Sequence, residues 1–162
     1  MQWIRQIVKW FLLVLLQVLI FNNLHLFGLC HPFIFILFLL EMPLLPRWAE
    51  MLVGAVTGLM MDIFCNSPGV HMAACTAVCY LRPLLLPRLV QNAERITDEV
   101  TPLSIGLNEY LRMICIMVPL YHVLVFVLEA WSLHHFGSLL TQILLSALVS
   151  LLLMIGYALC RR

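Results

Sequence analysis

Residues 53–70 read Val-Gly-Ala-Val-Thr-Gly-Leu-Met-Met-Asp-Ile-Phe-Cys-Asn-Ser-Pro-Gly-Val. Within this apolar stretch, Gly54, Gly58 and Asp62 follow one another at intervals of four residues. In an α-helix a step of four residues turns about 40° past a full circle, so the three residues share one narrow face. Two glycines there let another helix backbone approach closely, and a carboxylate at membrane depth must face protein or water. The pattern predicts a transmembrane helix built for helix contact, with a polar anchor at its end.

The composition of the whole chain is that of a membrane protein. Of its 162 residues, 64% are hydrophobic and 10% are charged, and the mean hydropathy is +1.04. A soluble domain carries about 25% charged residues, and its apolar residues do not form such long uninterrupted runs. The formal net charge of +1 gives no reason to expect nucleic-acid binding. We therefore expect an integral membrane protein in contact with membrane lipids.

Six apolar runs predict an all-α, polytopic bundle of six transmembrane helices that forms a single domain over residues 1–162. The runs cover residues 7–21, 33–45, 48–64, 70–86, 110–128 and 138–160. Clusters of Asn, Gly and Pro separate them, as expected of turns. The second run is short for a span and contains Glu41, so it is expected to be tilted, broken or partly re-entrant.

The positive charges orient this bundle. With six spans, all nine cations lie on or near one side: Arg5, Lys9, Arg47, Arg82, Arg88, Arg95, Arg112, Arg161 and Arg162. The positive-inside rule makes that side cytoplasmic and places both termini there. The first run is interpreted as a retained helix and not as a cleaved signal peptide, because no small-x-small cleavage site follows it. Residues 91–108 then form a polar cytoplasmic connector, either a solvated linker or a contact for a cytoplasmic protein.

One possible polar site lies inside the membrane. His122 stands in the middle of the fifth run, and Glu129, seven residues later, shares its helix face. An ionisable residue at this depth is a functional hypothesis by default. The pattern allows two interpretations: hydrogen bonding or packing near the kink expected at Pro119, or a role in handling a proton or a ligand.

Metal, disulfide and catalytic patterns are weak. Cys75 and Cys79 share a helix face, but without Cys-x-x-Cys spacing or a histidine pair they are interpreted as packing residues. A bridge between Cys30 and Cys65, and a metal site among the external histidines (His25, His31, His71, His134 and His135), are lesser alternatives. The chain has no nucleophile elbow, no phosphate-binding glycine loop and no paired catalytic carboxylates. We expect no enzyme activity, no cofactor and no metal.

The central motifs resemble a known family. The run Gly54-Ala-Val-Thr-Gly58-Leu-Met-Met-Asp62, then Ser67-Pro-Gly69 and Tyr80-Leu81, is similar to the central segment of the rod shape-determining protein MreD family. Residues 26–32, Leu-Phe-Gly-Leu-Cys-His-Pro, resemble the proline-containing turn before the second span of that family. The resemblance covers residues 24–82 by motif and the rest of the chain by layout.

The resemblance implies a non-catalytic component of the complex that elongates the bacterial cell wall and maintains cell shape, in the inner membrane. Its implied partners are the bitopic scaffold MreC and, through the complex, the actin-like filament protein and the peptidoglycan polymerase and transpeptidase. The face formed by Gly54, Gly58, Asp62 and Gly69 would then bind a partner helix or pack within the bundle.

The resemblance also implies a fold similar to the substrate-binding S components of energy-coupling-factor vitamin transporters. An S component or another small transporter is therefore the main alternative function. S components usually carry an Ala-x-x-x-Ala motif on the first helix, and this chain has no alanine before Ala49. An intramembrane enzyme ranks third.

Overall fold

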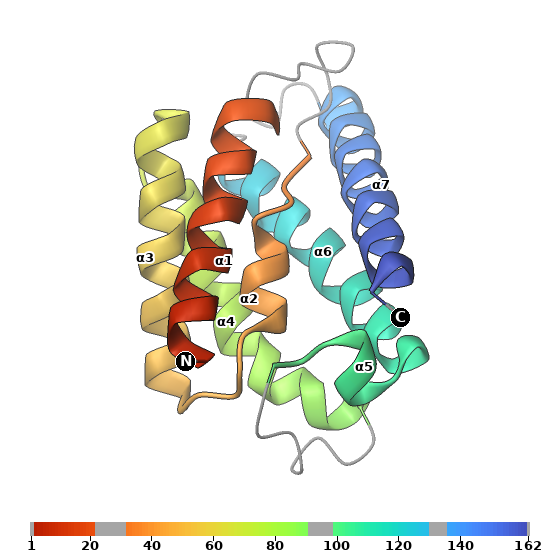
Figure 1. Cartoon of the computed structure of the whole chain (residues 1–162). Helices are drawn as coiled ribbons and strands as arrows, with labels where there is room; N and C mark the ends of the chain where they lie inside the picture. Colours follow the sequence, from red (N-terminus) through yellow and green to blue (C-terminus); the bar gives the residue numbers. More distant parts are fainter. Residues whose placement is uncertain (1, 22–31, 91–98, 130–135, 162) are drawn as a thin grey trace.

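A computed structural model describes residues 2–21, 32–90, 99–129 and 136–161 of the chain, and its regular structure is helical. The elements are α1 (Gln2–Leu16), the π-helix η1 (Gln17–Phe21), α2 (Ile36–Glu41), α3 (Arg47–Cys65), α4 (Val70–Leu89), α5 (Pro102–Ile105), α6 (Leu107–Glu129) and α7 (Phe136–Cys160). The long helices stand side by side as a bundle around the short α2 (Figure 1).

Four helical segments of the described chain are long and apolar enough to cross a membrane: Arg47–Cys65, Val70–Leu89, Leu107–Glu129 and Leu140–Cys160. They correspond to the predicted runs 48–64, 70–86, 110–128 and 138–160. The described part of the chain is thus all-α with four candidate membrane-spanning helices, and the predicted count of six is not confirmed. The run 7–21 lies in α1 and η1, where the helix changes from α to π geometry at Gln17.

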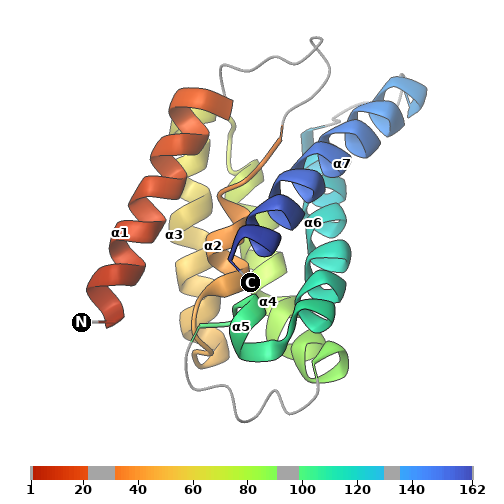
Figure 2. The same ribbon diagram turned by 45° about the vertical axis from the view of Figure 1, so that its right-hand side comes forward.

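The run 33–45 differs most from a full membrane span, because only its six residues in α2 are helical; of the predicted alternatives, the run is broken. Pro43 and Pro46 follow closely, and proline cannot donate the hydrogen bond that would continue the helix. Residues 32–42 are buried throughout, and α2 lies among the longer helices of the bundle (Figure 2). In place of a lipid-facing span, this segment forms the centre of the core.

Four of the long helices form two antiparallel pairs around this centre, α3 with α4 and α6 with α7. A tight turn joins α3 to α4, and its Asn66 and Gly69 have positive φ angles of 54° and 80°. The second pair is α6 with α7, and α4 packs against α6 to connect the pairs. The two ends of the chain lie on the same side of the bundle, since Arg5 and Arg161 both contact Glu99.

Candidate functional site

The predicted glycine face is covered by α4 of the same chain. A Cβ atom placed on Gly58 would lie 2.5 Å from Met72 Cα and would also collide with the His71 carbonyl oxygen. A Cβ on Gly54 would lie 2.7 Å from Cys79 Sγ. Both glycines are therefore needed for close approach of α3 and α4 within the chain, and Cys79 is a packing residue at that contact.

Asp62 is a helix cap. Its Oδ1 accepts hydrogen bonds from the His71 N–H at 2.9 Å and the Ser67 hydroxyl at 2.6 Å, and its Oδ2 accepts from the Met72 N–H at 2.9 Å. These two amides belong to the first turn of α4, whose N–H groups have no partner within the helix. Gly69, at the N-cap position, has no side chain to supply one. Asp62, the polar anchor predicted at the end of the α3 run, thus caps the N-terminus of α4.

A buried ion pair joins α3, α4 and the end of α2. Arg82 Nη1 donates to Glu50 Oε1 at 2.9 Å, and both side chains are fully buried. The other guanidinium nitrogens donate to the carbonyl oxygens of Leu40 and Met42. Carbonyls at the end of a helix lack partners within it, so Arg82 completes the C-terminus of α2. From the sequence, Arg82 was interpreted only as a marker of topology and Glu50 was not singled out, although charges of opposite sign inside two neighbouring apolar runs are a usable signal.

Glu41, the last residue of α2, is a fully buried carboxylate with donors from three other helices or their ends. Tyr110 of α6 donates at 2.6 Å, Tyr157 of α7 at 3.3 Å and Arg161 at 3.1 Å, while Lys9 of α1 forms an ion pair with it. The carboxylate therefore ties α1, α6 and α7 to the central helix at one end of the bundle.

Glu99 is a second carboxylate in the same cluster. It pairs with Arg5 at 2.9 Å, with Lys9 at 3.7 Å and with Arg161 at 3.6 Å. Burial lowers the pKa of Arg161, but the neighbouring Tyr157 and Glu41 outweigh burial and hold that pKa above its ordinary value. Of the predicted connector 91–108, residues 91–98 lie outside the described part, whereas Glu99 is buried against the bundle.

His122 is fully buried and bonded within the chain. Its Nδ1 lies 2.8 Å from the Val118 carbonyl oxygen, which can only accept, so Nδ1 carries the proton. Nε2 of the neutral ring then accepts from the Ser150 hydroxyl at 3.2 Å, and Ser150 Oγ accepts the Phe33 N–H at 3.0 Å. The histidine thus supports the backbone that leads into α2.

Gln17 supplies hydrogen-bond partners for two more backbone groups of the non-helical segment before α2. Its Nε2 donates to the Pro32 carbonyl at 2.9 Å, and its Oε1 accepts the Ile34 N–H at 2.8 Å. Non-helical backbone at membrane depth requires such partners, because lipid offers none. Gln17 and Ser150 together therefore allow residues 32–34 to run through the bundle interior without helical hydrogen bonds.

Other predicted sites are not assembled. Glu129 is exposed at the end of α6, beside the α3–α4 turn, and does not join His122. Within the described ranges, no three His, Cys, Asp or Glu side chains converge as metal ligands, and His71 instead lies 2.7 Å from the Tyr121 hydroxyl. His25, His31, His134, His135 and Cys30 fall outside those ranges.

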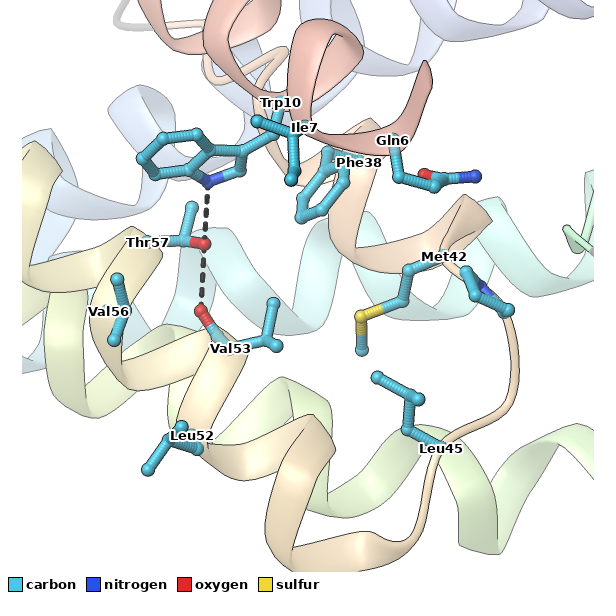
Figure 3. Close-up of a pocket in the computed structure, with 11 residues that line it drawn as sticks. Gln6, Ile7, Trp10, Phe38, Met42, Leu45, Leu52, Val53, Val56 and Thr57 are labelled. Carbon is cyan, nitrogen blue, oxygen red and sulfur yellow. Dashed lines mark hydrogen bonds between the residues drawn. The ribbon is translucent and has the colours of Figure 1, made fainter. Parts of the chain in front are cut away.

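A pocket of about 320 Å³ opens between α1 and α3, and Phe38 of α2 and the segment that follows α2 line the rest of it (Figure 3). Trp10 spans one end, where its indole N–H donates to the Thr57 hydroxyl at 2.9 Å and that hydroxyl donates to the Val53 carbonyl at 2.8 Å. The Gln6 amide lies at the other end, and neither its nitrogen nor its oxygen has a partner among the described residues. Sequence reasoning missed Gln6, a lone amide between Arg5 and Ile7.

Comparisons with known protein families, with curated proteins and with solved structures find no match to this chain.

Proposed function

We propose that this chain is a non-catalytic integral scaffold of the complex that elongates the bacterial cell wall. In this proposal it lies in the inner membrane, crosses it six times with both termini in the cytoplasm, and acts as the MreD-like proteins it resembles do. It binds a bitopic MreC-like partner and, through the complex, the actin-like filament protein and the peptidoglycan polymerase and transpeptidase.

The observation that carries the proposal is that Gly54, Gly58 and Asp62, which lie at the centre of the MreD resemblance, form one structural unit with α4. Gly54 and Gly58 bring α4 onto α3, and Asp62 caps α4 across the turn. Such a unit is a fixed helix pair, since Gly54 and Gly58 make close backbone contacts and Asp62 bonds to backbone N–H groups. A fixed pair of helices suits a protein that holds others in place.

The buried polar groups also support a scaffold. A general base or a nucleophile must reach a substrate, so its side chain must be open to a cleft. The polar side chains of His122, Arg82 and Glu41 are instead fully buried and bonded to other groups of the chain. Their arrangement stabilises the positions of α2, α4, α6 and α7 relative to one another.

Depletion of the protein in its rod-shaped host tests the proposal. We expect the cells to become round, and we expect recovery of the MreC-like partner in the elongation complex to fall, with both effects reversed by a plasmid copy. Cells that keep their width and their pattern of wall insertion, but lose uptake of a small solute, would favour the transporter alternative and refute the scaffold.

A further inference from the structure

A groove of about 400 Å³ lies between α1 and the end of α7 and is called the α1–α7 groove below. Figure 1 shows these two helices on either side of α2, whose Leu37 also lines the groove. The α1 wall carries Arg5 and Lys9, while Tyr157 of α7 and Arg161, directly after α7, form the opposite wall. Three cations from two ends of the chain therefore surround one opening.

The positive charge of this groove is only partly balanced. Among the described residues, Arg5, Lys9 and Arg161 form ion pairs with two carboxylates, Glu41 and Glu99. The Glu41 side chain is fully buried, and that of Glu99, which also lines the groove, is 7% exposed. The side chains of Arg5 and Arg161 are 69% and 36% exposed. The negative charge is thus turned into the protein, and the excess positive charge lies on the exposed side.

The exposed cations keep hydrogen-bond donors for an occupant. Arg5 donates to Glu99 through Nη2, and a guanidinium carries five N–H donors in all. Arg161 directs Nη1 to Glu41 and to the Tyr157 hydroxyl, which leaves donors on its other nitrogens. Arginine binds phosphate oxygens through paired, charge-assisted hydrogen bonds. The two guanidinium groups therefore suit a phosphate at the opening of the groove.

Beyond the cations the groove has an apolar wall on α1. Val8 and Leu12 line it and are 51% and 57% exposed. Steps of three and four residues from Arg5 keep these side chains on one face of the helix. At a rise of 1.5 Å per residue, Leu12 lies about 10 Å from Arg5 along the helix axis. A phosphate held by the cations can therefore leave an attached acyl chain against this wall.

We propose that the α1–α7 groove binds an anionic phospholipid of the cytoplasmic leaflet. Its phosphate lies at Arg5, Lys9 and Arg161, and one acyl chain follows Val8 and Leu12. Basic pockets between transmembrane helices on the cytoplasmic side bind anionic headgroups in this way. The bound lipid balances the excess positive charge and bridges α1 to α7. The lipid site rests on the bundle orientation given under the proposed function and not on the scaffold role.

Lipid selectivity and one exposed arginine test the headgroup site. The full chain is purified in detergent, and native mass spectrometry measures its affinity for phosphatidylglycerol and for phosphatidylcholine with the same acyl chains. Phosphatidylglycerol should bind more tightly, and Arg5→Gln should weaken its binding about fivefold while leaving phosphatidylcholine unchanged. Arg47→Gln is the matched control, because Arg47 is also exposed but stands at the start of α3, outside the groove. The Tm of each lipid-free variant checks its folding.

Photo-crosslinking locates the acyl chain. A photoreactive residue at position 12 lies in the groove, whereas one at position 15 lies on the exposed surface of the same helix outside it. In a bilayer of equal parts phosphatidylglycerol and phosphatidylcholine, adducts at position 12 should be enriched in phosphatidylglycerol. Adducts at position 15 should follow the composition of the bilayer. Glycerophosphoglycerol, the same headgroup without acyl chains, should compete only weakly for the site.

Several results would overturn the lipid site. Equal affinity for the two lipids, or equal losses of phosphatidylglycerol affinity for Arg5→Gln and Arg47→Gln, would refute the headgroup contact. Full competition by glycerophosphoglycerol would make a free phosphate compound the occupant. An adduct at position 12 with a second copy of the chain or with another protein, in place of lipid, would also refute the assignment.

The lipid site and the scaffold role fail separately. If depleted cells keep their shape while the purified chain selects phosphatidylglycerol through Arg5, the scaffold proposal fails and the lipid site stands. If depleted cells become round but the chain does not distinguish the two lipids, only the lipid site fails.

Discussion

Arg82 on α4 and Glu50 on α3 form an ion pair of 2.9 Å with both side chains fully buried. The pair lies beside the C-terminus of α2, where Arg82 also donates to the Leu40 carbonyl oxygen at 3.2 Å. Removing one partner of a buried pair leaves an uncompensated charge, whereas removing both is often far less damaging. The guanidinium here therefore controls how the short central helix is held between its neighbours.

We predict that Arg82→Met lowers the free energy of unfolding by about 3–5 kcal/mol, and that adding Glu50→Leu recovers part of the loss. Thermal unfolding in detergent, analysed as a double-mutant cycle, measures the coupling. Arg88→Met provides the control on the same helix, because Arg88 is exposed and surface changes stay within about 0.5 kcal/mol. Equal losses for Arg82→Met and Arg88→Met would contradict this account.

The close contact between α3 and α4 predicts that replacing glycine by alanine has opposite effects on stability at two positions. Alanine favours a helix over glycine by about 1 kcal/mol, so Gly156→Ala on α7, where a Cβ meets nothing within 4 Å, should be neutral or stabilising. Gly58→Ala should be destabilising despite the same propensity gain, because its Cβ would lie 2.5 Å from Met72 Cα. Folded yield and Tm of the two variants decide the matter, and a more stable Gly58→Ala would show that α3 and α4 are not packed this closely.

The long helices could be predicted from sequence because length and apolarity alone define a candidate membrane span. The ends of α3 and α4 agree with the predicted runs to within three residues, since the turn residues Asn66 and Gly69 interrupt them. The run that holds α2 was predicted to be tilted, broken or partly re-entrant, but its burial at the centre of the bundle could not be predicted. An apolar run that faces lipid and one that is buried among helices look alike until the neighbouring helices are placed.

The candidate site was predictable only where spacing was informative. Four-residue spacing put Gly54, Gly58 and Asp62 on one face, but the covering helix and the capped amides depend on the fold of the turn. The same antiparallel register that sets Cys79 against Gly54 also sets Arg82 against Glu50. Two opposite charges in neighbouring apolar runs can be noticed in the sequence, but the register that pairs them is known only from the fold of the hairpin.

We predict that Ser150 contributes more to the stability of the fold than a single hydroxyl hydrogen bond would. Ser150→Ala leaves two buried groups without partners, the Phe33 N–H and His122 Nε2, and each such group costs about 1–3 kcal/mol. Thr76→Ala is the control, since the Thr76 hydroxyl only supplements a carbonyl of its own helix. Tm should fall clearly for the first variant and little for the second.

His122→Gln should be tolerated, because a glutamine oxygen can still accept the Ser150 hydroxyl. Complementation of the depleted rod-shaped host measures this, with Tm as the check on folding. Loss of cell shape in a variant that folds normally would point to proton transfer at His122 and away from a supporting role.

The proposed orientation predicts accessibility at the two ends of α4. Pro68 precedes the helix and Arg88 lies near its end, and both are exposed. In a cysteine-free background, Pro68→Cys should react with a membrane-impermeant maleimide in intact cells, and Arg88→Cys should react only after the membrane is opened. The reverse pattern would place the cation-rich side outside and overturn the orientation.

Glu41, Glu99 and their partners form one cluster, in which we predict that the buried Tyr110 stabilises the fold much more than the exposed Arg5. Tyr110→Phe removes a 2.6 Å hydrogen bond to the buried carboxylate, and hydrogen bonds to charged groups contribute about 1.5–3 kcal/mol. Arg5→Ala removes an ion pair whose arginine side chain is 69% exposed, and such pairs contribute about 0–1 kcal/mol. Salt screens exposed charges far more than buried ones, so raising the salt concentration should shrink the effect of Arg5→Ala and leave that of Tyr110→Phe in place. Unfolding measured for both variants at low and high salt tests this ranking, and an Arg5→Ala loss that equals the Tyr110→Phe loss at high salt would show that Glu41 is not the centre of the cluster.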